Sequence, residues 1–222
     1  MYMDDNFIAK AEAWKQRHGG KKAGYREMIP GDDFDLGEDG SALYYADWDV
    51  VGIMFRDWKP AQSHNISIQG TSGKTSYFLS VGYNHEEGVM TFNPDKLNKY
   101  NANMNVTSDI TNWLQIGGRF SYSDKAYTTP NTRRNTYTYM WRWGSFFGPY
   151  GTYQGIDMKN DIAYLKQAGD DKTNDSYTRI GAFLKATIIK GLTLNADYTF
   201  NINNKTTKSV GLPVICWNSW GG

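Results

Sequence analysis

The feature that most constrains this chain is an alternation of apolar and polar side chains that recurs from His64 to Asn203. Successive side chains of a β-strand point to opposite faces, so the alternation predicts strands with one apolar and one polar face. About six runs show it, many of them about ten to fourteen residues long, roughly twice the ~5–6 residues of an ordinary strand. Their apolar members are Ile66 and Ile68; Tyr77, Leu79, Val81 and Tyr83; Tyr100, Ala102, Met104 and Val106; Leu114, Ile116, Gly118, Phe120 and Tyr122; Ile180, Ala182, Leu184, Ala186 and Ile188; and Leu192, Leu194, Ala196, Tyr198, Phe200 and Ile202.

The connections between these runs are of two kinds. Residues 71–74, 108–112 and 190–191 are tight, Gly-, Asn- or Asp-bearing turns, whereas residues 85–96 and 124–177 are long loops. Because tight and long connections alternate, an antiparallel sheet would gather all the tight turns at one end. Outer-membrane barrels typically show this asymmetry between short turns and long loops. A strand that crosses the membrane needs ~9–11 residues, and many of these runs are long enough. The predicted fold class is therefore all-β: a segment of an antiparallel transmembrane β-barrel.

A soluble β-sandwich is the alternative, because its strands also alternate apolar and polar residues. It would be a secreted or surface protein that binds carbohydrate through its aromatic loop. Strand length, Ala and Gly on the apolar face and the one-sided loops favour the barrel. Aromatic residues near the expected strand ends would form the interfacial girdles of a barrel: Tyr83, Tyr100, Trp113, Tyr122, Tyr127, Tyr177 and Tyr198.

Composition argues against nucleic-acid binding and against a transmembrane helix. The net charge of +1 gives no electrostatic basis for nucleic-acid binding, and Cys216 is the single cysteine. The mean hydropathy of −0.64 leaves no run suited to a transmembrane helix. The N-terminus has no apolar stretch like that of a signal peptide, and about six strands are too few to close a barrel. We therefore expect a fragment of a longer protein.

Outside the strands, the sequence predicts a helix over residues 4–17, with Ile8, Ala11 and Trp14 at helical spacing and Gly19-Gly20 at its end. An acidic run follows (Asp32, Asp33, Asp35, Glu38 and Asp39), which we interpret as a solvated loop, because its spacing lacks the twelfth-position Glu of an EF-hand calcium site. A short helix is expected at 160–167.

The long loop carries the candidate binding residues, an aromatic segment with arginines interleaved. Tyr139, Trp141, Arg142 and Trp143 are the candidate substrate-binding residues, because aromatic faces stack on sugars and arginine binds hydroxyl groups. The alternative is that they pack within the loop or against a protein partner. The histidines and carboxylates form no catalytic or zinc motif, so we expect no enzyme, no catalytic residues, no metal and no cofactor.

Several motifs resemble the start of the barrel in the SusC/RagA family of TonB-dependent outer-membrane transporters. They are Asp47-Trp48, Phe55-Arg56-Asp57-Trp58, the segments 62–70 and 74–83, Ile110-Thr111-Asn112-Trp113-Leu114 and Ile189-Lys190-Gly191-Leu192-Thr193. The resemblance covers roughly residues 45–203.

The resemblance implies the cell outer membrane of a Gram-negative, Bacteroidetes-like bacterium as the location. It also implies a 22-stranded barrel with an N-terminal plug, which imports glycans or peptides using the TonB complex. The partners would be a SusD-like lipoprotein, the oligosaccharide or peptide substrate and outer-membrane lipid, with no nucleic acid. The expected regions are 1–60, which joins plug to barrel and forms an early extracellular loop; 61–204, the barrel strands with the loop 124–177; and 205–222, the start of another extracellular loop.

Overall fold

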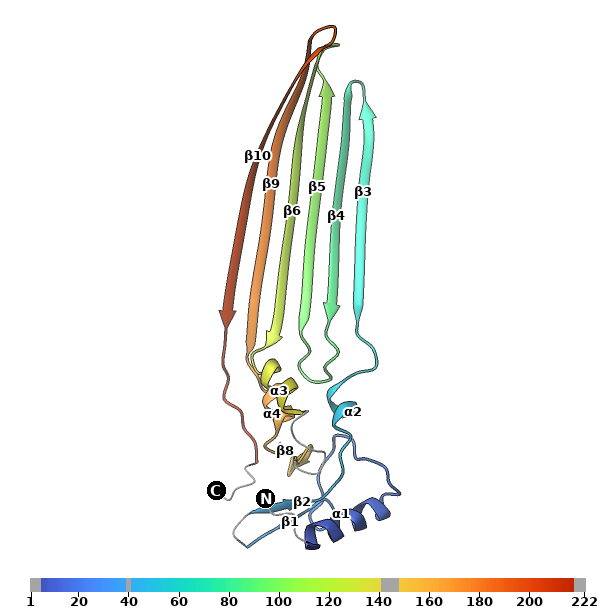
Figure 1. Cartoon of the computed structure of the whole chain (residues 1–222), viewed down its shortest axis with the longest axis vertical. Coiled ribbons are helices and arrows are strands. Elements are labelled where there is room, and N and C mark those ends of the chain that lie inside the picture. The colour runs from blue at the N-terminus through green and yellow to red at the C-terminus, as the bar shows by residue number, and fades with distance from the viewer. Residues whose placement is uncertain (1–4, 39–40, 141–147, 218–222) are drawn as a thin grey trace.

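A six-stranded antiparallel sheet dominates the structure, a computed structural model that describes residues 5–38, 41–140 and 148–217 (Figure 1). The strands are β3 (Ala61–Ser72), β4 (Thr75–Glu87), β5 (Lys96–Asp109), β6 (Leu114–Pro130), β9 (Asp170–Ile189) and β10 (Leu192–Ser209). Their order across the sheet is β10-β9-β6-β5-β4-β3, so those of the six strands that follow one another along the chain also lie side by side in the sheet. The predicted all-β class, with antiparallel strands and a short N-terminal helix, is confirmed.

The strand register aligns the apolar residues into rows that cross the whole sheet. One row contains Ile68, Leu79, Met104, Phe120, Ile180 and Phe200, and the next row toward the loops contains Ile66, Val81, Ala102, Tyr122, Thr178 and Ile202. We call this side the apolar face and the opposite side the polar face. Ile66 is 68% exposed and Phe200 is 52% exposed. Among the described residues no second sheet covers the apolar face, so the two-sheet packing of a β-sandwich is not the fold of this part of the chain.

All three tight turns lie at one end of the sheet, and the long loops lie at the other (Figure 1). Gly73 (φ 61°) and Gly191 (φ 89°) take left-handed conformations that the turns require and that L side chains rarely adopt.

The strands extend farther toward the loops than the alternation predicts. β6 and β9 remain paired up to Pro130 opposite Asp170, and β10 continues to Ser209. The predicted loop 124–177 is therefore confined to 131–169, and residues 205–209 belong to a strand. These extensions are polar on both faces, so they lack the alternation that identifies a strand.

Of the aromatic residues expected near the strand ends, some lie at the edge of the apolar face and others do not. Tyr83 and Tyr100 lie opposite each other at the loop-side limit of the apolar rows, with ring centroids 5.0 Å apart. Tyr127 and Tyr177 lie on the polar face, and Tyr198 lies within β10 rather than near its end. Tyr127 and Tyr177 are on the polar face because they lie an odd number of residues from Tyr122 and Ile180, which are on the apolar face.

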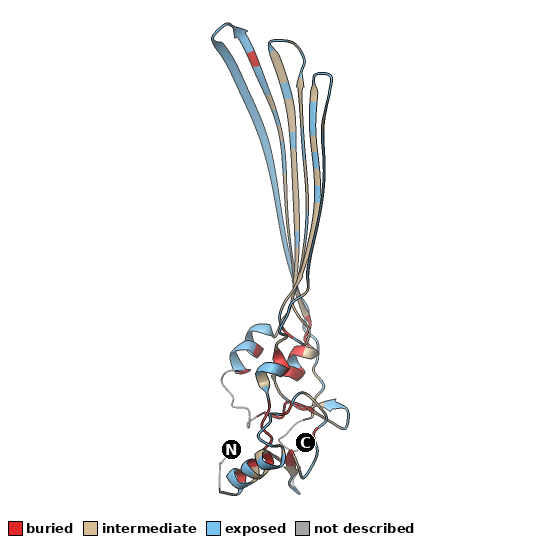
Figure 2. Cartoon of the chain, turned by 90° about the vertical axis from the view of Figure 1, so that its right-hand side faces the viewer, coloured by how far each residue is buried: buried red, intermediate tan, exposed pale blue. Residues whose placement is uncertain are grey.

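Segments far apart in the sequence pack together at the loop end into a unit that we call the head, formed by residues 5–38, 41–60, 88–95, 131–140, 148–169 and 210–217. It contains the helices α1 (Asp5–Arg17), α2 (Val50–Met54), α3 (Arg133–Met140) and α4 (Asp161–Lys166), and the short strands β1 (Phe34–Leu36), β2 (Ala42–Tyr44), β7 (Thr152–Tyr153) and β8 (Ile156–Asp157). Most buried side chains lie in the head, whereas the sheet is mainly exposed or half-buried (Figure 2). None of the described helices has both the length and the apolar character needed to cross a membrane.

The local sequence accounts for two of the helices. α1 matches the predicted helix and is followed by Gly19 and Gly20, both at positive φ. Its buried face contains Phe7, Ala11 and Trp14, whereas the predicted Ile8 is 46% exposed. α4 matches the helix expected at 160–167. The Asn160 side chain caps its start, because it accepts hydrogen bonds from the first free backbone N–H groups of the helix.

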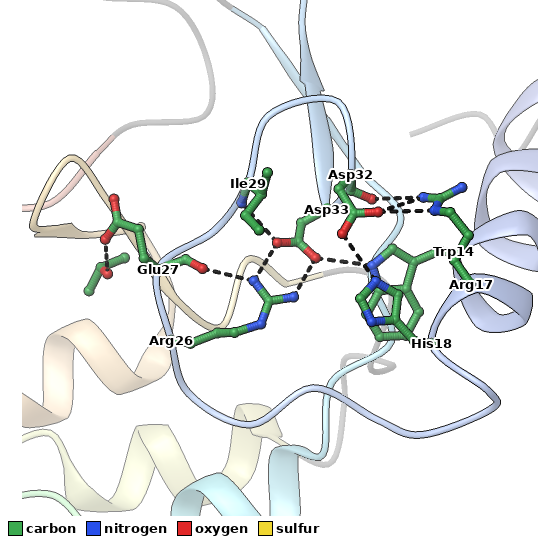
Figure 3. A network of polar contacts seen from close by, with 9 residues as sticks. Trp14, Arg17, His18, Arg26, Glu27, Ile29, Asp32 and Asp33 are labelled. Carbon is green, nitrogen blue, oxygen red and sulfur yellow. Dashed lines mark hydrogen bonds and ion pairs between the residues drawn. The ribbon is translucent and has the colours of Figure 1, made fainter.

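A buried carboxylate joins α1 to the loop that follows it (Figure 3). Asp33 is fully buried and accepts hydrogen bonds from Trp14 Nε1 at 3.0 Å and from the Ile29 N–H at 2.8 Å. The Arg26 guanidinium binds its two oxygens at 2.6 and 2.7 Å. The predicted solvated loop is therefore wrong at Asp33, because a fully paired carboxylate can be buried. Asp39 lies outside the described residues.

The neighbouring Asp32 and His18 lie close enough to Asp33 to suggest a metal site, since one donor atom from each lies within 4.8 Å of the others. Arg17 binds Asp32 at 2.8 Å, and Arg26 binds Asp33. These two guanidinium groups compensate both carboxylates, so the group does not fit a cation site.

Burial by itself raises the pKa of the Asp33 carboxyl, but the hydrogen bonds from Arg26, Ile29 and Trp14 outweigh it and lower the pKa. A carboxyl with a lower pKa in the folded state stabilises the fold above its unfolded pKa of ~3.9. That contribution is lost as the pH falls through the folded pKa. We therefore expect the head to loosen in acid below about pH 4.

Asp33→Asn tests this anchor. Removing one partner of a buried ion pair costs ~3–5 kcal/mol, and because Arg26 keeps 34% of its side chain exposed we expect a loss of about 2–3 kcal/mol. Hydrogen exchange of the Trp14 and Ile29 backbone amides at pH 7 would measure this loss of stability. Asp32→Asn is the matched control, with an expected cost below about 1 kcal/mol because Asp32 is partly exposed. Equal protection in the two variants would contradict the assignment.

Candidate functional site

A cavity of about 680 Å³ lies where the head meets the loop end of the polar face. Residues from α3, β4, β5, β6 and β9 and from the segments before β3 and between β4 and β5 line it: Phe55, Lys59, Glu86, Glu87, Gly88, Val89, Met90, Asp95, Leu97, Tyr127, Thr129, Pro130, Asn131, Arg133, Arg134, Tyr137, Thr138 and Asp171. We call it the mouth cavity. It is large enough for several residues or sugar units of a ligand.

The sheet register accounts for the cavity floor. Leu97 pairs with Glu86 on one side and with Tyr127 on the other, so the three side chains form one row. This row alternates with positions of the apolar face and therefore lies on the polar face. The strand extensions beyond the apolar rows thus supply the floor, and the head supplies the walls.

Two acidic groups of the cavity, Asp95 and Glu86, are paired with basic side chains. Tyr127 donates a hydrogen bond to Asp95 Oδ2 at 2.9 Å, and Arg133 donates one to the Tyr127 hydroxyl at 2.6 Å. Arg133 also lies 3.7 Å from Asp95, and Lys59 lies 3.2 Å from Glu86. These contacts fix the orientation of the Tyr127 ring and leave no unpaired carboxylate among them.

Two further groups of the wall are exposed. The Tyr137 ring meets Phe55 edge-on, with centroids 6.4 Å apart, and half of its side chain is exposed. The neighbouring Arg134 is exposed, and its guanidinium has no hydrogen-bond or ion-pair partner within the described part of the chain. The wall therefore offers an apolar ring and a free cation side by side on α3.

Of the candidate residues expected from sequence, only Tyr139 is described. It lies on α3, is 37% exposed and does not line the mouth cavity. Trp141, Arg142 and Trp143 lie outside the described residues. Sequence reasoning did identify the aromatic and arginine-rich character of this loop, which includes Arg134 and Tyr137. It missed Phe55, Lys59 and Tyr127, because only the packing of the head on the sheet brings them to one place.

The polar face continues below the cavity as a surface of hydrogen-bonded and charged side chains. Ser121 donates a hydrogen bond to Asn103 across the β5–β6 pair at 2.9 Å. Arg119 pairs with Asp197 across the sheet at 3.1 Å. The face is thus suited to contact with water or with polar solutes along most of its length.

A second polar cluster holds the head segments to one another. Lys166 of α4 lies 2.6 Å from Asp157 and donates a hydrogen bond to the Tyr25 hydroxyl at 2.9 Å. Burial alone raises the pKa of Asp157, but hydrogen bonds from Lys166 and Tyr25 lower it. Gln167 exchanges two hydrogen bonds of 2.8 Å with the backbone of Ile215. One short stretch after β8 therefore fixes both the N-terminal segment and the segment after β10.

Comparison with known proteins gives matches in structure alone. No protein-family profile and no curated protein sequence matches the chain. Two solved structures do match, those of the RagAB peptide transporter and of the RagAB peptide importer in the "closed-closed" state, with TM-scores of 0.52 and 0.55.

The two matches cover 72% and 74% of this chain at 20% identity. The matched region makes up 19% and 20% of the length of the two matched chains, so this chain spans about a fifth of them. At this identity the likeness establishes the fold. The resemblance to the SusC/RagA family that the motifs indicate is thereby confirmed at the level of the fold, since the chain shares the fold of a segment of these structures.

Proposed function

We propose that this chain forms early barrel strands and extracellular loops of a TonB-dependent, SusC-like transporter in the cell outer membrane. The observation that carries the proposal is the exposed apolar face, whose rows cross all six strands in register. A face of this size exposed to water would promote aggregation, whereas lipid covers it without cost.

The height of the apolar face fits a bilayer. In β10 the alternating apolar residues run from Leu192 to Ile202, which is about 33 Å along the strand at ~3.3 Å per residue. At the ~40° tilt of outer-membrane strands this gives a band about 25 Å tall, the height of the apolar band in such barrels. Beyond Ile202 the strand carries Asn204, Thr206 and Lys208 on the same face, which suits the water outside the bilayer.

In this arrangement the polar face lines the interior of the barrel, and the mouth cavity lies at its extracellular opening. A glycan or peptide entering the barrel would meet the cavity first. The proposed complex includes a SusD-like lipoprotein that delivers the substrate and the TonB complex that supplies energy. The matched structures are those of a peptide transporter and a peptide importer, which supports import as the activity. Glycan and peptide are the two substrate classes of the proposal.

Leu79→Arg in the complete protein tests the membrane assignment. Leu79 lies in the middle of the apolar rows, where an arginine facing lipid costs ~2–4 kcal/mol. We expect the heat-modifiable, folded band in outer-membrane fractions to fall strongly. Ser80→Arg, one residue away on the polar face, is the matched control and should leave most of that band. A soluble periplasmic product in both cases would refute the proposal.

The aromatic part of the long loop remains a proposed contact for the substrate, through Tyr139, Trp141, Arg142 and Trp143. We expect Trp141→Ala with Trp143→Ala to weaken substrate binding by the complete transporter about tenfold, the effect of ~1.4 kcal/mol of lost stacking. Trp113→Ala, at an exposed tight turn, is the control for loss of a tryptophan. Unchanged substrate affinity with weaker lipoprotein binding would assign these residues to the partner instead.

A further inference from the structure

The polar face carries an unbalanced group of cations just below the mouth cavity. Lys99 of β5 pairs directly with Lys125 of β6, Lys125 with Asp175 of β9, and Asp175 with Lys205 of β10. The four residues form one row across the sheet, with three positive charges against one negative charge. The row lies two residues, or about 7 Å, below the Leu97–Tyr127 row that forms the cavity floor.

The fold does not compensate these charges internally. Within the described ranges, Lys99, Lys125 and Lys205 form no ion pair and no side-chain hydrogen bond, and Lys99 and Lys125 are exposed. Like charges directly opposite in a sheet are destabilising, so Lys99 beside Lys125 has a cost that the sheet itself does not offset.

The surrounding groups reinforce the positive character of the row. Two rows farther along the same face, Arg179 donates a hydrogen bond to Asn201 at 3.1 Å and has no carboxylate partner in the described structure. On the cavity side, Arg134 is free, Glu86 and Asp95 are held by Lys59 and Arg133, and the carboxylate of Asp171 accepts a hydrogen bond from Ser209. The cations without a counter-ion thus extend from the cavity wall down the polar face.

We propose that the row Lys99–Lys125–Lys205 is a binding site for the carboxylate groups of the transported solute. The inference rests on the proposed function and deepens it, because it makes the substrate an anionic chain. A carboxylate between Lys99 and Lys125 would accept hydrogen bonds from both ammonium groups and remove their mutual repulsion. Arg134 would bind the same chain earlier, at the cavity wall, while Tyr137 and Phe55 pack on its apolar part.

Carboxylates along a chain can come from an acidic peptide or from a uronic-acid oligosaccharide, and both share the chemistry that the row recognises. Two probe pairs separate them. A tetragalacturonate is compared with its neutral, fully methyl-esterified form, and a glutamate-rich pentapeptide is compared with the same peptide carrying glutamine. Within each pair only the charge changes appreciably.

The measurement is the affinity of the complete, detergent-solubilised protein for these probes by calorimetry at low ionic strength. We expect the carboxylate-bearing member of one pair to bind at least about tenfold more tightly than its neutral counterpart, and the advantage to shrink with added salt. The double variant Lys99→Gln, Lys125→Gln should lose that advantage and keep its affinity for the neutral probe. Lys74→Gln with Lys190→Gln, the same charge change at two tight turns, is the control and should behave as the parent.

Several results would overturn the inference. Equal affinity for the charged and neutral members of both pairs would do so, as would an advantage that survives the double variant. If the lysines instead pair with another part of the protein, the double variant would lower its melting temperature and leave probe preference unchanged. Failure of the proposed function is distinct, because it would appear as loss of the heat-modifiable outer-membrane band before any probe is added.

Discussion

The in-register pairing of six long strands is the constraint on which the rest of the structure depends. Because side chains alternate with a period of two, a slip of one residue in any pair would move an apolar row to the polar face. The observed register keeps every row on its own side, from Ile68 in β3 to Phe200 in β10. The same pairing satisfies the backbone hydrogen-bonding groups, which a bilayer requires, and leaves β3 and β10 as the edges that need further partners.

The two ends of the sheet are stabilised by different interactions. At the turn end, short connections with Gly73 and Gly191 in left-handed conformations hold the strands with almost no buried core. At the loop end, the head has a true hydrophobic core around Trp14, Trp48 and Phe34, organised by the buried Asp33–Arg26 pair. The sheet therefore depends on its surroundings to cover it, whereas the head covers itself. The mouth cavity lies at the boundary between the sheet and the head.

The sequence predicted those features that depend on local periodicity or local capping. Alternation identified the strand positions from Ile66 to Ile202, Gly19-Gly20 marked the end of α1, and a short helix was expected where α4 lies. The strand extensions up to Pro130, from Asp170 and to Ser209 were missed, because both of their faces are polar. Asp33 was misjudged and Tyr127 was missed as a site residue, since their environments arise from partners such as Trp14 and Asp95 that are distant in sequence.

The interlocking of the head has a consequence for which parts of it can change independently. Lys166 and Gln167 of one loop bind Tyr25 of the N-terminal segment and Ile215 of the segment after β10. An exchange of any single loop would break contacts that the remaining loops need for their own shape. The head segments therefore depend on one another for their shape, so a point change on the strand wall would disturb the head less than the replacement of a whole loop.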